Sequence, residues 1–164
     1  QLEIKPDVLL TAKGLGNGLP IGVCMARGEA AQLLGPGDHG STYGGNPLCC
    51  AAAIAVLTSL RDDNVMQRAR SVREVLLAAL HQAITDPDLI TEVRGSGLMI
   101  GIQPRVATKE IVQRGLESGL LINVAGGDTI RVLPPLVMTD EQAGELGAGI
   151  ANIINDIAEQ ENAL

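Results

Sequence analysis

The most constraining feature of this chain is an apolar run that ends in one lysine and is followed by three alternate glycines. Residues 9–20 read LLTAKGLGNGLP, with Lys13 as the only charge and glycines at positions 14, 16 and 18. This pattern predicts a strand and then an open turn. An ammonium at the end of a buried strand is costly to hold unless it is paired or used covalently. Alternate glycines let a flat ligand or another backbone approach closely.

Together these features suggest that Lys13 forms an imine, because burial of a lysine favours the neutral amine that attacks a carbonyl. A surface lysine in a flexible turn is the alternative. The glycine spacing differs from GxGxxG, and the pattern GxxxxGK[ST] is absent. These differences exclude the two common nucleotide-binding turns for the stretch at positions 14–18.

Composition excludes other classes of function. The 164 residues are 46% apolar and 1% aromatic, so a core must be built from Leu, Ile, Val and Ala. The formal charge is −7 and the basic residues are scattered, which argues against a nucleic-acid partner. The longest apolar run, 48–57, is too short to cross a bilayer. We therefore expect neither a nucleic-acid nor a membrane partner, and no signal peptide is visible.

The cysteines indicate a reducing compartment. Cys24, Cys49 and Cys50 are odd in number, and two of them are sequence neighbours that make poor disulfide partners. No CxxC pattern occurs and the chain has two histidines, so we expect no metal site. The three thiols are expected to be buried and inert, and the chain to be cytoplasmic.

Hydrophobic periodicity and turn signals predict a mixture of helices and strands. Strands are predicted over 8–11, 21–26, 90–94, 98–102, 120–124 and 129–133. Helices are predicted over 29–34, 47–60, 63–84 and 109–118, with a last helix beginning after Thr139. The helix 47–60 should begin at an Asn46 cap with Pro47 in its first turn. Because it is apolar nearly all round, we expect it to be buried.

Two further stretches carry candidate functional residues. Residues 39–47 read HGSTYGGNP, where Ser41 and Thr42 precede a glycine pair and a helix N-terminus, an arrangement that favours a bound anion. A plain glycine-rich loop before a capped helix is the alternative. Arg131 alternates with apolar residues on the strand 129–133, which suits bidentate binding of a carboxylate. A structural salt bridge is the alternative there.

In this order and at these spacings, the stretches resemble the class III aminotransferases, which are fold-type I enzymes that use pyridoxal 5'-phosphate (PLP). The matching words are PDVLLTAKGLGNGLPIG, HGSTYGGNPLCCAAAIAVL, RGSGLMIGI and GLLINVAGGDTIRVLPPL. Within the class, the words are most similar to acetylornithine aminotransferases, with the ornithine and succinylornithine enzymes nearby. The resemblance implies an α/β chain, comprising the end of the large PLP-binding domain and a small C-terminal α+β domain. The implied boundaries are 1–60 for the large domain with the lysine, 61–85 for a linking helix, and 86–164 for the small domain.

The resemblance also implies residue roles. Lys13 would bind PLP covalently and then move a proton between the substrate and the cofactor, whose ring is the electron sink. Thr42 would hold the PLP phosphate of a neighbouring subunit, Ser41 would contact the substrate, and Arg131 would bind its carboxylate. Three parts of the family's site have no match here: the loop that receives the phosphate within the subunit, the aromatic residue on the ring, and the Asp at the pyridine nitrogen.

The resulting prediction is part of a homodimeric transaminase of arginine biosynthesis that moves an amino group from N-acetylornithine to 2-oxoglutarate. Its partners would be amino-acid and 2-oxo-acid substrates and a second subunit that completes the cofactor site. Ornithine, succinylornithine or 4-aminobutyrate as the donor is an alternative within the class. A non-catalytic module whose long helices dimerise is an alternative outside it. The 164 residues alone are expected to bind PLP weakly and to lack activity.

Overall fold

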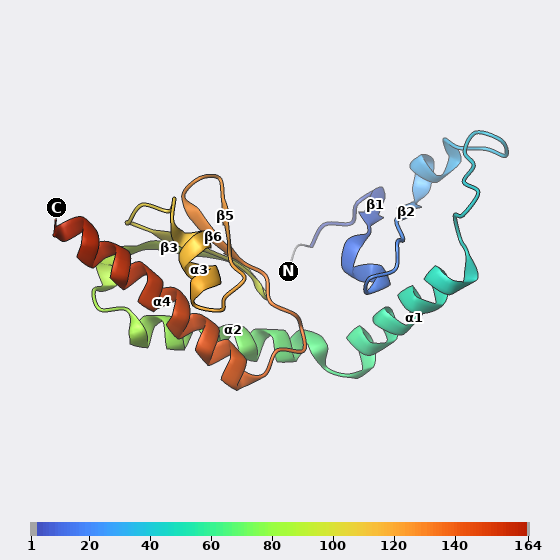
Figure 1. Cartoon of the computed structure of the whole chain (residues 1–164). Coiled ribbons are helices and arrows are strands. Elements are labelled where there is room, and N and C mark those ends of the chain that lie inside the picture. The colour runs from blue at the N-terminus through green and yellow to red at the C-terminus, as the bar shows by residue number, and fades with distance from the viewer. Residues whose placement is uncertain (1–2, 164) are drawn as a thin grey trace. The chain divides into compact units, whose positions relative to one another are not determined.

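The computed structural model describes residues 3–163, which divide into two compact units. The first extends to Asn64 and the second begins at Val65, and each is described by itself (Figure 1). Helix α2 therefore belongs to the second unit. The three-part division 1–60, 61–85 and 86–164 concerns the domains of an aminotransferase and stays a prediction.

The first unit begins with a two-stranded antiparallel sheet. Strand β1 (Val8–Thr11) pairs with β2 (Val23–Ala26). Both lie within the strands predicted over 8–11 and 21–26. The 3-10 turns η1 (Lys13–Gly16) and η2 (Gly28–Gln32) follow the two strands. The expectation that the first strand is buried is wrong, because Val8, Leu9 and Leu10 are all exposed. A two-stranded sheet has no second layer of its own to cover its faces.

Helix α1 (Pro47–Asp62) ends the first unit, and its N-terminus forms as predicted. The Asn46 Oδ1 atom accepts a hydrogen bond from the Cys49 amide at 3.0 Å. The expected burial of this helix is wrong: Leu48, Ile54 and Leu57 have exposed fractions of 69%, 64% and 55%. The helix packs against the short turn η1, which is too small to cover an apolar surface that runs all round.

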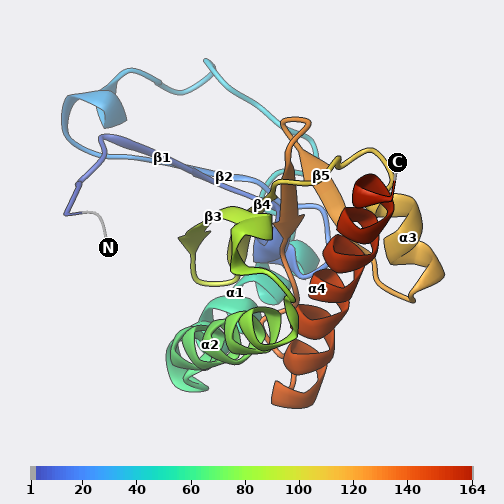
Figure 2. The ribbon, with the colours of Figure 1, turned by 90° about the vertical axis from the view of Figure 1, so that its left-hand side faces the viewer.

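The second unit packs two long helices on one face of a sheet (Figures 1 and 2). Helices α2 (Val65–Ala83) and α4 (Asp140–Asn162) lie side by side. The strands are β3 (Ile90–Ser96), β4 (Met99–Pro104), β5 (Asn123–Ala125) and β6 (Thr129–Val132). They form an antiparallel sheet in the order β3-β4-β6-β5. The turn η3 (Pro87–Leu89) precedes β3, and the short helix α3 (Ile111–Glu117) lies beside β5 and α4.

The core of this unit is aliphatic, as the composition requires. The predicted stripe on α2 is buried at Ala69, Val72, Leu76 and Leu80. It meets the inward residues of β4 and β6 and the apolar face of α4, including Ile100, Ile102, Ile130, Val132, Ile150 and Ile154. Each fully buried aliphatic side chain contributes about 1.5–3 kcal/mol. The core therefore leaves the alternate residues of the strands on the opposite, helix-free face of the sheet.

Polar contacts fix the ends of the two long helices. Thr139 and Gln142 form the capping box that the sequence predicts at the start of α4. At the end of α2, the side chain of Asn155 accepts hydrogen bonds from the Thr85 amide and hydroxyl and donates one to the Ala83 carbonyl. This buried amide thus satisfies groups that the helix terminus leaves without intrahelical partners.

Candidate functional site

Lys13 is the first residue of η1, two positions after the end of β1, and its backbone is in the left-handed region with φ at 54°. This conformation is uncommon for residues other than glycine, and it concentrates at functional sites. The expected burial of the side chain is wrong, because Lys13 is exposed within its unit. A Cβ atom added at Gly14 or Gly18 would meet nothing within 4 Å, whereas one added at Gly16 would lie 2.9 Å from Ile21 Cγ2. Gly14 and Gly18 therefore have open space around them, as the sequence suggests, while Gly16 is packed against Ile21.

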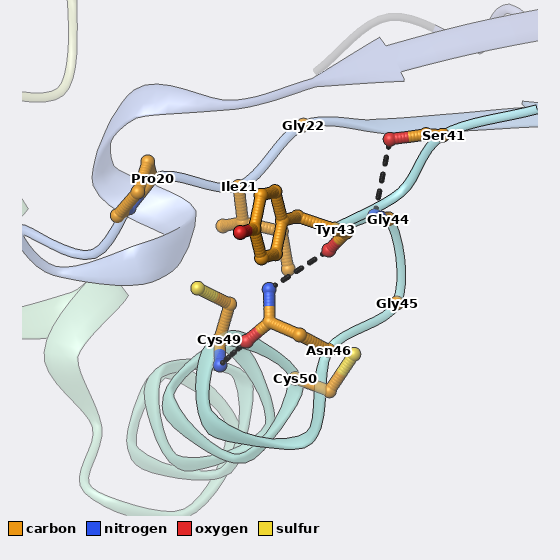
Figure 3. A pocket seen from close by; sticks show the side chains of 10 residues that line it. All are labelled: Pro20, Ile21, Gly22, Ser41, Tyr43, Gly44, Gly45, Asn46, Cys49 and Cys50. Atoms are coloured by element: carbon orange, nitrogen blue, oxygen red, sulfur yellow. Dashed lines mark hydrogen bonds between the residues drawn. The ribbon is translucent and has the colours of Figure 1, made fainter.

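Ser41 lines a pocket of about 340 Å³ at the N-terminus of α1 (Figure 3). Its Oγ atom accepts a hydrogen bond from the Gly44 amide at 3.1 Å. A Cβ atom at Gly44 would lie 3.0 Å from the Ser41 Cβ, so glycine lets the loop turn this tightly. The amide fixes the hydroxyl oxygen, while the hydroxyl proton can still be donated. Thr42 is the next residue along the loop and is exposed.

The sequence interpretation missed two polar residues of this pocket, Tyr43 and Asn46. The Asn46 side chain donates to the Tyr43 carbonyl at 3.0 Å while it caps α1 (Figure 3). Both residues belong to the HGSTYGGNP stretch, and membership of that stretch is the sequence signal that could have identified them as pocket residues. The same pocket is lined by Cys49 and Cys50, whose side chains point in different directions (Figure 3).

Arg131 lies on β6 in the second unit, on the helix-free face of the sheet. It is exposed, and its guanidinium makes no hydrogen bond or ion pair with any residue in 3–163. It lines a pocket of about 400 Å³ together with Arg94 and Asp128. The alternative of a structural salt bridge is therefore not found within the described part of the chain.

Two of the four predicted site residues are brought together by the loop before α1, namely Ser41 and Thr42. Lys13 belongs to the same unit but does not line the Ser41 pocket, and Arg131 belongs to the other unit. The expectation of buried thiols holds for Cys49, holds only in part for the half-buried Cys50, and is wrong for Cys24, which lies exposed on the two-stranded sheet. Residues 3–163 contain no cluster of side chains that could hold a metal ion. No helix in that range has the length and apolarity needed to cross a membrane.

Comparison with known proteins identifies the family. The class-III aminotransferase family matches residues 1–154, and this chain belongs to it. An acetylornithine aminotransferase of Mycobacterium tuberculosis is 45% identical over 155 residues, which are 93% of this chain and 38% of that protein. One from Bordetella parapertussis is 40% identical over 97% of this chain and 40% of its own length. The chain thus spans about 40% of the curated relatives it matches.

Solved structures agree with the sequence relatives and show the fold-type I architecture. The ornithine aminotransferase of Toxoplasma gondii superposes with a TM-score of 0.86 at 33% identity, covering 96% of this chain and 39% of that one. The acetylornithine aminotransferase of Elizabethkingia anophelis superposes with a TM-score of 0.80 at 34% identity, covering 94% and 40%. The predicted family and fold class are therefore confirmed.

Proposed function

We propose that this chain is part of a PLP-dependent transaminase that moves an amino group from N-acetylornithine to 2-oxoglutarate in arginine biosynthesis. The observation that carries the proposal is the family match combined with acetylornithine aminotransferase relatives at 40–45% identity. A structure of the Toxoplasma gondii ornithine aminotransferase is described as having partial PLP occupancy at its active site. Membership of the same family supports PLP as the cofactor here.

The residues present fit this cofactor. Lys13 offers an exposed amine beside Gly14, which has open space around it, so a flat ring can approach the lysine. When bound, PLP supplies the electron sink for the reaction. Lys13 Nζ would hold the cofactor covalently and, once displaced by the substrate amine, would carry the proton from the substrate carbon. This role requires the lysine to be covered during the reaction, because water would compete for the proton.

The other predicted residues would bind and orient. The Ser41 hydroxyl is held by the Gly44 amide at 3.1 Å and can donate its proton to the substrate. The Thr42 hydroxyl is exposed and can donate to a phosphate oxygen of a neighbouring subunit's cofactor. Arg131 presents an unpaired fork, which suits a substrate carboxylate. Replacing Arg131 with Ala should therefore raise KM for the amino donor at least tenfold, since hydrogen bonds to charged groups contribute about 1.5–3 kcal/mol.

We further infer a homodimer in which each subunit contributes to the other's cofactor site. The exposed loop at Ser41 and Thr42 supports this arrangement, since its hydroxyls remain available within their own unit. The three cysteines, which are all free thiols, support a reducing cytoplasm.

Ornithine is a second candidate donor, because the superposition with the Toxoplasma gondii ornithine enzyme has the higher TM-score of the two structures above. Steady-state kinetics of the complete enzyme with ornithine and with N-acetylornithine would separate the two. A kcat/KM for N-acetylornithine at least tenfold above that for ornithine supports the proposal. The reverse ratio favours the ornithine enzyme.

Borohydride reduction tests the role of Lys13 independently of activity. The complete enzyme, loaded with PLP, is reduced and digested, and mass spectrometry locates the pyridoxyl group. We expect it on Lys13 in the native enzyme and nowhere in Lys13→Asn, a variant chosen because Asn tolerates the left-handed backbone. Lys5→Asn is the matched control and should keep the label. A label on another lysine would contradict the role of Lys13. No label at all would contradict the proposal and leave the non-catalytic module as the better account. The 164 residues alone should bind PLP weakly and show no turnover.

A further inference from the structure

Four polar side chains form a closed ring of hydrogen bonds on the helix-free face of the second unit. Arg94 Nη1 donates to Gln103 Oε1 at 3.1 Å, and Gln103 Nε2 donates to Asp128 Oδ2 at 3.0 Å. The Thr129 hydroxyl donates to Asp128 Oδ1 at 2.7 Å and accepts from Arg94 Nη2 at 2.8 Å. Each of the four residues of this polar ring is thus held by two others, across β3, β4 and the start of β6.

A glycine makes the polar ring possible. In the sheet register Arg94 lies opposite Gly101 on β4, and Gly101 lies opposite Arg131 on β6. A Cβ atom at Gly101 would lie 3.1 Å from Thr129 Cγ2 and 3.4 Å from Arg94 Cγ. Because Gly101 has no side chain, Arg94 can cross β4 and reach Thr129 on the next strand.

One member of the polar ring, Asp128, is a carboxylate that shares a pocket with Arg131. Asp128 and Arg131 line the same cavity of about 400 Å³, and opposite charges at a protein surface attract each other, typically by up to about 1 kcal/mol. Both carboxylate oxygens of Asp128 nevertheless accept hydrogen bonds from neutral donors of the polar ring. Arg94 in turn pairs with Glu92. Arg131 is left without a partner among residues 3–163.

We propose that the polar ring is a positioning device that keeps the Asp128 carboxylate from pairing with Arg131, so that Arg131 stays available for a substrate carboxylate. The inference rests on the proposed function of Arg131. Its residues are positioning residues, because they act on the substrate through Arg131 and do not touch the reacting atoms. If a ring contact is lost, Asp128 becomes an internal competitor for the guanidinium.

Thr129→Val in the complete enzyme opens the polar ring at its most buried member, since Thr129 is 6% exposed and valine has nearly the same shape. KM for N-acetylornithine should rise about fivefold, which corresponds to an exposed ion pair of about 1 kcal/mol. The value of kcat should change less than twofold, because the reacting groups are untouched. Gln103→Leu opens the polar ring at a half-buried position and should likewise raise KM with little change in kcat.

Removing the charge of Asp128 distinguishes an effect of the polar ring on Arg131 from an effect on the stability of the fold. Adding Asp128→Asn to Thr129→Val should return KM to within twofold of the native value, since the amide has no charge to offer Arg131. Damage to the fold would not be repaired by that second change. Thr91→Val is the matched control: its hydroxyl donates to the Gln103 carbonyl at 2.8 Å, outside the polar ring, so its KM should remain native.

The Arg131→Ala variant distinguishes a wrong role for Arg131 from a wrong role for the polar ring. If Arg131→Ala leaves KM unaltered, the carboxylate role of Arg131 is wrong and the inference loses its basis. If Arg131→Ala raises KM but the ring variants do not, or Asp128→Asn fails to rescue Thr129→Val, the inference alone is overturned.

Discussion

Gly147 allows the two long helices of the second unit to approach each other. A Cβ atom at this position would lie 2.2 Å from the Leu76 carbonyl oxygen and 3.0 Å from the Leu80 amide nitrogen. It would also lie 3.1 Å from Ala79 Cβ, whereas ordinary contacts begin near 3.4 Å. Two of the three atoms belong to the backbone of α2 and cannot rotate away. Gly147→Ala must therefore push α4 from α2 by about an ångström.

The expected change in the free energy of unfolding of Gly147→Ala is the sum of two opposing contributions. Alanine in a helix interior is favoured over glycine by about 1 kcal/mol. Overpacking a well-filled contact costs about 1–3 kcal/mol and occasionally more. Here the cost should exceed that range, because displacing the helices also loosens the contacts of Leu76, Leu80 and Ile150. Subtracting the propensity gain leaves an expected net loss of more than about 2 kcal/mol in the free energy of unfolding.

Gly144→Ala is the matched control on the same helix. A Cβ atom there would meet nothing within 4 Å, so the propensity term acts alone and the variant should gain up to about 1 kcal/mol. Urea unfolding of both variants, followed by circular dichroism, would measure the two changes in opposite directions. A Gly147→Ala chain at least as stable as the native one would refute the close approach of α2 and α4.

Two further predictions concern polar contacts. Asn155→Ala should lower the free energy of unfolding by about 1–3 kcal/mol, because the Thr85 amide and the Ala83 carbonyl lose their partner; urea unfolding measures this, and an unchanged midpoint would contradict it. The Arg61 side chain donates to the Asp62 carboxylate and lowers the pKa of that carboxyl from its ordinary 3.8. The stabilisation that this pair provides is therefore present above pH 3.8 and is lost as the pH falls through the lowered pKa. Since the pair is fully exposed, NMR titration should show the Asp62 pKa returning toward 3.8 in Arg61→Ala with no measurable change in melting temperature.

The sequence was sufficient for the local elements because their signals are local. The capping box at Thr139 and Gln142, the Asn46 cap and the apolar stripe of α2 all lie within a few turns of the residues that they order. The strand positions followed from alternation and from glycine turns. Each of these features requires information from neighbours along the chain and little else.

Burial and long-range contacts could not be obtained in the same way. The run 48–57 is apolar whether or not a second surface covers it, so composition alone cannot place it in a core. Arg94 and Thr129 are 35 positions apart, and their contact depends on a strand order that no local pattern encodes. The left-handed backbone at Lys13 also carries no sequence signal, because its neighbours would equally suit an ordinary turn.

Helix α1 has a practical consequence for anyone who handles this chain by itself. Several leucine and isoleucine side chains of this helix are exposed to water, and exposed apolar patches of this kind promote aggregation. Preparations of the isolated polypeptide should accordingly grow turbid with concentration. Polar replacements at Ile54 and Leu57 should delay that turbidity without weakening the separately packed second unit.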